Sequence, residues 1–115
     1  MDVISTFYAA LQREDYASAR QCLADEGFSF VGWFDVFDDP DAYIEAVKKL
    51  RGFATRFEVK RVFVDDGDVA LFYEIETVRG DVTLVAAWFQ VREARIARVR
   101  IVCDTRPFAE VWGRT

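Results

Sequence analysis

The sequence predicts an α+β fold: a cone-shaped, curved antiparallel sheet with about three N-terminal helices packed on its concave face. Apolar residues recur at helical spacing up to about residue 52 and alternate with period two between residues 53 and 103. The links between the later strands are too short for parallel crossovers, so neighbours in sequence are expected to pair antiparallel. A chain of 115 residues fits one domain, residues 1–115, and leaves no room for a second.

Two short helices are expected at the N-terminal end. Asp2 is a favoured N-cap, and the residues behind it share one helical face: Val3, Ile4, Phe7, Tyr8 and Leu11. A second helix is expected to start at Asp15 and to end near Gly27. The apolar run at residues 28–34 then predicts a first short strand.

The third helix has the clearest start signal in the chain. Asp39, Pro40 and Asp41 supply a cap, a first-turn proline and a first-turn acid. The helix is expected to end at Gly52, behind basic residues in its last turns.

Four strands follow, at residues 53–64, 69–78, 82–92 and 96–103. Turns are expected at Asp66 and Gly67, around Gly80, and at Glu93 and Ala94. Helices followed by a meander of long strands predict helices on one face of a curved sheet.

Composition excludes several classes of function. The net charge is −5 without clustered Lys and Arg, which disfavours nucleic acid and anionic membranes as partners. The first residues lack the features of a signal peptide, so a cytoplasmic location with Cys22 and Cys103 reduced is expected. The chain contains no His and no glycine-rich phosphate loop, so no metal site and no cofactor are expected.

Two segments resemble a known family. The run FYAAL at residues 7–11, followed by EDY at 14–16, is similar to the first helix and acidic turn of the nuclear transport factor 2-like superfamily. The run RIARVRIVCD at residues 95–104 is similar to the last strand of that superfamily, which often ends on an aspartate. This superfamily includes SnoaL-like cyclases and ketosteroid isomerases, so the resemblance implies a cone with an internal pocket.

The resemblance also tests the chemistry of the family position by position. The places of the isomerase catalytic groups look like Phe7, Val31 and either Ala87 or Phe89, none of which titrates. Steroid isomerase activity is therefore not expected. The places of the epoxide hydrolase triad look like Glu74, Glu76 and Ile101, which keep one acid and lose the rest.

Candidate site residues follow from strand alternation together with the resemblance. The concave side is assigned Phe72, Glu74, Glu76, Val85, Ala87, Phe89, Val99, Ile101 and Cys103. Candidate catalytic residues are Glu74 and Glu76, with Asp104 or Tyr43 as helper. Candidate ligand-binding residues are Trp33, Tyr43, Phe72, Phe89 and Ile101. The alternatives are that the two glutamates face water or pair with arginines of a neighbouring strand, and that the aromatic residues are core.

Three functions stay open. The leading hypothesis is a domain that binds a small, mainly apolar or aromatic molecule in its cone. The alternatives are an acid–base enzyme of the cyclase, isomerase or lyase type, and a non-catalytic dimerisation module filled by its own Phe side chains. A homodimer is expected through the convex face, because Leu84, Ala86 and Trp88 make that face apolar, together with Leu71, Tyr73 and Ile75. Arg98 and Arg100 are expected at its rim.

Overall fold

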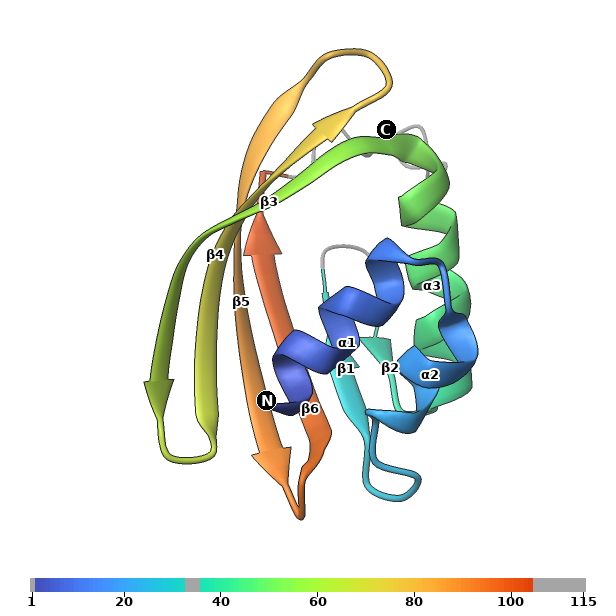
Figure 1. Ribbon diagram of the computed structural model, residues 1–115, viewed down its shortest axis with the longest axis vertical. Coiled ribbons are helices and arrows are strands. Elements are labelled where there is room, and N and C mark those ends of the chain that lie inside the picture. Colours follow the sequence, from blue (N-terminus) through green and yellow to red (C-terminus); the bar gives the residue numbers. More distant parts are fainter. Residues whose placement is uncertain (1, 33–35, 105–115) are drawn as a thin grey trace.

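The computed structural model describes residues 2–32 and 36–104, in which three helices pack against a six-stranded curved sheet (Figure 1). This confirms the predicted α+β class. The helices cover one face of the sheet, and no described element covers the other. No helix among the described residues is long and apolar enough to cross a membrane.

Each helix begins at a side-chain cap. Helix α1 spans Val3–Gln12, and the Asp2 carboxylate accepts a hydrogen bond from the Ser5 backbone nitrogen at 2.8 Å. Helix α2 spans Tyr16–Gln21 behind the cap Asp15. Helix α3 spans Pro40–Phe53 behind the cap Asp39, which confirms the predicted start. It ends one residue beyond Gly52, where Ala54 turns to an extended backbone and the chain enters the sheet directly.

The strands are β1 (Ser29–Val31), β2 (Val36–Phe37), β3 (Ala54–Asp65), β4 (Asp68–Thr77), β5 (Val82–Arg92) and β6 (Arg95–Cys103). Their order across the sheet is β2-β1-β6-β5-β4-β3. The four long strands match the predicted ones within two residues at each end. Strand β1 pairs parallel to β6, and every other described pair is antiparallel. Strand β2 was not predicted, because a two-residue strand has no readable period.

The hydrophobic core lies between the helices and the concave face. Its largest fully buried side chains include Phe7 of α1, Phe89 of β5, and Ile96 and Val99 of β6. Apolar side chains of this size each stabilise the fold by about 1.5–3 kcal/mol when fully buried. The packing of α1 across the sheet therefore fixes the interior of the cone.

Strand β4 faces the opposite way from its prediction. Tyr73 lies opposite Val85, and Glu74 lies opposite Leu84. Side chains on one side of this pair therefore share a face with Val85, which is fully buried against the helices. Leu71, Tyr73 and Ile75 point into the cone, and Phe72, Glu74 and Glu76 point away from it. The predicted faces of β5 and β6 are correct.

Candidate functional site

Aromatic rings fill the depth of the cone. The ring of Tyr8 on α1 lies 6.0 Å from Phe89 and 5.3 Å from Phe57, measured between centroids. Phe57 stacks on Tyr73 at 4.4 Å. Contacts at these separations are favourable aromatic pairs, so this part of the interior is packed rather than hollow.

Tyr43 and Tyr73 are buried in the apolar interior, and Tyr8 is partly buried against the same core. Burial raises the pKa of Tyr8, Tyr43 and Tyr73, since the phenolate form loses its hydration there. The rings of Tyr8 and Tyr73 lie edge to face, with their centroids 6.2 Å apart. At neutral pH these groups are un-ionised phenols, which can donate a hydrogen bond but cannot act as a base.

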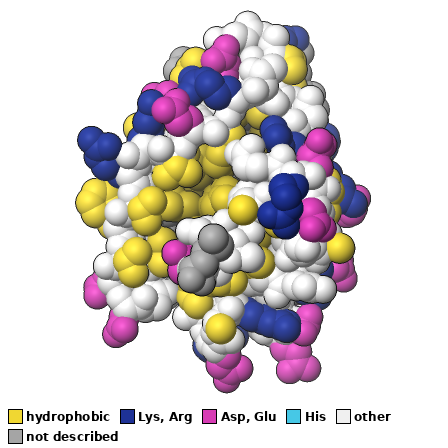
Figure 2. Space-filling model, in the orientation of Figure 1, with side chains coloured by type: hydrophobic (Ala, Val, Ile, Leu, Met, Phe, Trp, Pro, Cys, Tyr) yellow, Lys and Arg dark blue, Asp and Glu magenta, His cyan; other side chains and the backbone are white. Residues whose placement is uncertain are grey.

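An apolar groove opens between α1 and the β3–β4 hairpin, beside this cluster. Its volume is about 830 Å³, and Figure 2 shows a hollow lined by hydrophobic side chains on this face of the molecule. The walls are formed by Val3, Ile4 and Tyr8 of α1, Val59, Val62 and Val64 of β3, Val69 and Leu71 of β4, and Val91 of β5. The charged residues in its lining are Asp2 and Asp66, and none of its described lining residues is Lys or Arg.

The groove forms because the second half of β3 runs away from the helices. Strand β3 runs from the end of α3 across the top of the view in Figure 1 and then down the side of the sheet away from the helices. The register shifts between Val59 and Arg61, which leaves Lys60 as an extra residue and bends the strand. As a result Val59, Val62 and Val64 turn toward α1 but remain 42%, 52% and 67% exposed.

The tip of the β3–β4 hairpin is fixed against β5. The Val91 backbone nitrogen donates to the Gly67 carbonyl oxygen at 2.8 Å. A side chain at Gly67 would place its Cβ only 2.9 Å from the Val91 carbonyl oxygen, so glycine is required by close approach. The hairpin wall of the groove is therefore held in place at its far end.

The predicted catalytic glutamates lie outside the cone. Glu76 accepts a hydrogen bond from Arg56 Nε at 3.1 Å, and Glu74 lies 3.5 Å from Arg56 Nη2 and 3.6 Å from Lys60 Nζ. The hydrogen bond with Glu76 also raises the pKa of Arg56. The prediction that both carboxylates face the cavity is wrong, and the alternative that they pair with a neighbouring strand is confirmed.

Asp104 does not complete a site with these glutamates. It follows the end of β6, while both glutamates lie on β4 with β5 between them. Two strand spacings amount to about 10 Å, which is too far for one proton-transfer site. The Asp104 backbone oxygen accepts a hydrogen bond from Thr83 at 3.5 Å, and its negative charge adds to the raised pKa of Cys103.

The predicted ligand-binding residues are dispersed. Phe72 lies on the convex face against Phe63, with centroids 6.0 Å apart, so its predicted inward orientation is wrong. Phe89 and Tyr43 point inward but are buried in core packing, and Ile101 is half-buried on the same side. Trp33 lies outside the described residues.

Sequence reasoning missed Tyr8, Tyr73 and the three groove valines. Helical spacing already placed Tyr8 on the buried face of α1, but the neighbouring Phe7 was taken for the family position. Alternation grouped Tyr73 correctly with Leu71 and Ile75, yet it did not say which face they share. Nothing in the sequence signals that β3 would bend away from the helices.

No metal centre is evident in this geometry. Within residues 2–32 and 36–104, no three His, Cys, Asp or Glu side chains are grouped so that they could hold an ion. Cys22 and Cys103 are both free thiols.

Sequence comparisons find neither a matching family profile nor a matching curated protein. Solved structures do match. An NTF2-like protein of unknown function from Cytophaga hutchinsonii is 24% identical, with a TM-score of 0.79 over 91% of this chain and 89% of that chain. A putative polyketide cyclase from Sinorhizobium meliloti is 15% identical, with a TM-score of 0.78 over 87% and 93%.

An LEH-like epoxide hydrolase of M. tuberculosis is 18% identical, with a TM-score of 0.75 over 95% of this chain and 85% of that chain. The chain therefore has the fold of NTF2-like proteins, and the resemblance read from its sequence is confirmed at the level of the fold. These identities are too low to carry an activity across, and the fold hosts several activities.

Proposed function

We propose that this chain binds a small, mainly apolar molecule in the groove between α1 and the β3–β4 hairpin. One observation carries the proposal: three valines of β3 face the helix side, yet 42–67% of their surface is exposed in a groove of about 830 Å³. Ligand sites commonly enclose about 300–1,000 Å³ and are lined mainly by apolar side chains. A ligand there would remove the exposed valine surface from water.

The lining also limits the charge of the ligand. Asp2 and Asp66 lie in the lining without a basic residue among the described lining groups, so an anion would meet repulsion. Ser5 and Thr6 of α1 supply polar contacts at the same end. A neutral or cationic apolar molecule fits this lining best.

Ligand binding is better supported by the structure than acid–base catalysis. An acid–base enzyme needs a titratable group that is free to exchange a proton with the substrate. Asp2 is engaged as the helix cap, and hydrogen bonds from Ser5 lower its pKa, so it stays ionised. Glu74 and Glu76, on which the enzyme alternative rested, lie on the other face of the sheet.

A fluorescence titration with the neutral apolar dye Nile red tests this proposal. Val59→Asp places a charge in the groove wall and should weaken dye binding at least about tenfold, since a buried unpaired carboxylate costs several kcal/mol. Val82→Asp is the matched control, because Val82 is exposed to a similar extent (52%) and lies outside the groove lining. Equal loss in both variants, or no dye binding by the wild type, contradicts the proposal.

A second proposal concerns the bare face of the sheet: a homodimer through the convex surface. Large apolar side chains are exposed on adjacent strands there, namely Phe72 on β4, Leu84 and Trp88 on β5, and Val102 on β6. Leu71, Tyr73 and Ile75 do not contribute, because they point inward. Burying one self-complementary patch across a two-fold axis is the commonest route to a dimer.

Two arginines lie at the border of that patch. The Arg100 guanidinium lies 5.7 Å from the centre of the Trp88 ring, and Arg98 donates to Gln90 at 3.4 Å.

We also propose a reducing, cytoplasmic location for the protein. The two free thiols support this proposal, because disulfides are rare in that compartment.

A further inference from the structure

Strand β3 is an edge strand with an unusual exposed segment. It pairs with β4 on one side and forms the end of the sheet among the described strands. Its last five residues, Arg61–Asp65, are all exposed, including Val62, Phe63 and Val64 at 52%, 57% and 67%. An edge strand of this kind offers unpaired backbone N–H and C=O groups to another strand.

The residue types in this segment are symmetric about Phe63, except that the two ends carry opposite charges. Its order is Arg61, Val62, Phe63, Val64, Asp65. An antiparallel pair centred on Phe63 would place Arg61 opposite Asp65 of the other copy, Val62 opposite Val64, and Phe63 opposite itself. Residues directly opposite in an antiparallel pair lie on the same face, so each match is a real contact.

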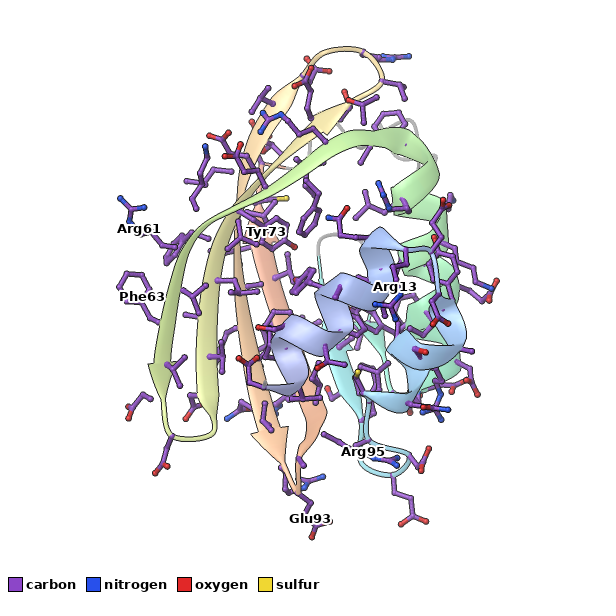
Figure 3. The ribbon with its side chains drawn as sticks, viewed as in Figure 1. Arg13, Arg61, Phe63, Tyr73, Glu93 and Arg95 are labelled. Carbon is purple, nitrogen blue, oxygen red and sulfur yellow. The ribbon has the colours of Figure 1, made fainter. Side chains whose placement is uncertain are left out.

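Neither charged side chain of the segment, Arg61 or Asp65, forms an ion pair with another described residue. Arg61 donates only to the Lys60 carbonyl oxygen at 2.8 Å and makes no ion pair there. Asp65 likewise has no ion pair or side-chain hydrogen bond with a described residue. Figure 3 shows the Arg61 and Phe63 side chains projecting from the sheet edge, away from the helices.

We propose that this segment of β3 binds the same segment of a second copy of the chain, antiparallel, about a two-fold axis at Phe63. The two sheets then join into one continuous sheet, with Arg61 of each copy paired to Asp65 of the other. Because the axis stands perpendicular to the sheet, the inner faces stay on one side. Val62 and Val64 of both copies then form one apolar strip beside the two grooves.

Charged residues on an edge normally prevent this kind of association. They do so when like charges meet, but here the reversed order brings opposite charges together. The bulge at Lys60 limits the pairing to residues 61–65, and Lys60 itself is already paired with Glu58 and Glu74. The segment is thus short and self-specific, and the proposal depends on neither the groove ligand nor the convex face.

Charge reversal with mixing tests it. Arg61→Asp puts acid opposite acid in a homodimer, and Asp65→Arg puts base opposite base. Sedimentation velocity should show that either variant alone has a dissociation constant raised by about tenfold or more. An equimolar mixture of the two should associate like the wild type, because each interface then joins an all-acidic segment to an all-basic one.

The control is a mixture of Arg13→Asp, which follows α1 (Figure 3), and Glu45→Arg on α3. It reverses two exposed charges away from β3 and should change nothing. Circular dichroism establishes that each variant is folded. The proposal is overturned if the wild type shows no self-association at about 100 μM, if the single variants associate like the wild type, or if mixing restores nothing. Trp88→Glu, on the convex face, should leave the mixing effect intact.

Discussion

The indole nitrogen of Trp88 on β5 donates a hydrogen bond to Asp68 Oδ1 on β4 at 2.9 Å. The same oxygen accepts from Gln90 Nε2 at 3.2 Å. The polar edge of the indole is thus satisfied within the chain, while 45% of the residue stays exposed on the convex face. An aromatic ring that is fixed in place and needs no further hydrogen bond is well suited to the centre of an interface.

Replacing Trp88 with Glu should halve the molar mass measured by light scattering after size exclusion. The substitution removes a large apolar contact and sets two like charges facing each other across the proposed two-fold axis. A loss of solubility would have the same cause, because the remaining apolar patch would be left uncovered.

Val78→Glu serves as the control for this experiment. Val78 is 58% exposed beyond the end of β4 and outside the patch, so the same change of charge should leave the mass unaltered. A wild type that runs as a single chain at micromolar concentration would show that the convex face is not an interface.

Stability should fall steeply at alkaline pH because of the buried tyrosines. In the unfolded chain a phenol ionises near pH 10, whereas burial raises the pKa of Tyr8, Tyr43 and Tyr73 above that value. Above pH 10 the unfolded state therefore binds fewer protons than the folded state. The free energy of unfolding then falls by up to about 1.4 kcal/mol per pH unit for each such phenol, and it is unaffected by these groups below about pH 9.

Urea unfolding of the wild type and of Tyr73→Phe between pH 7 and 11 measures this effect. Below pH 9 the difference in stability between the variant and the wild type should stay constant, because no phenol ionises there in either state. Above pH 10 the difference should shift in favour of the variant, since it has one phenol fewer to ionise. Parallel curves across the whole range would mean that Tyr73 is not desolvated.

The thiol of Cys103 should react slowly in the folded protein. Burial, together with the negative charge of Asp104, raises its pKa to about 12. At pH 8 only about 1 in 10⁴ such thiols is ionised, against roughly a quarter for a free cysteine, and the thiolate is the reactive form. Labelling by a chromogenic disulfide reagent should therefore be at least about a thousandfold slower than in urea.

Asp104→Asn should speed this labelling several-fold, because it removes the charge that opposes the thiolate. Asp66→Asn, at the opposite end of the long strands, should not. One thiol that labels rapidly in the native wild type at pH 8 would contradict the raised pKa of the partly buried Cys103 and the burial of Cys22.

The helices and long strands of this fold could be predicted from the sequence, because each depends on a local signal. The Asp39 cap and the following proline set the start of α3, and the turns at Gly67 and Gly80 separate the long strands. The parallel pairing of β1 with β6 depends on residues about 70 positions apart, and no local pattern encodes it.

The residues of the site could not be predicted in the same way, because their positions depend on the register and curvature of the sheet. Pairing of Glu76 with Val82 decides which side of β4 faces the helices, and a shift of one residue would have put both glutamates inside the cone. The groove depends on how far β3 bends at Lys60, which follows from packing of the whole sheet. Strand alternation therefore grouped the residues of β4 correctly but could not assign their side.

The turn between β5 and β6 offers a direct gain in stability. Glu93 and Ala94 both adopt positive φ, at 54° and 65°, in the two-residue link that joins these strands. A left-handed conformation costs a residue with a Cβ about 1–2 kcal/mol, and glycine avoids that cost while losing more entropy on folding. Ala94→Gly should therefore raise the free energy of unfolding by about 0.5–1 kcal/mol, seen as a higher urea midpoint at unchanged slope. Ala70→Gly, in the interior of β4, should lower the midpoint instead, because there the added freedom of the unfolded chain is not offset by relief of strain. A lower midpoint for both variants would show that the turn at Ala94 carries no strain for glycine to relieve.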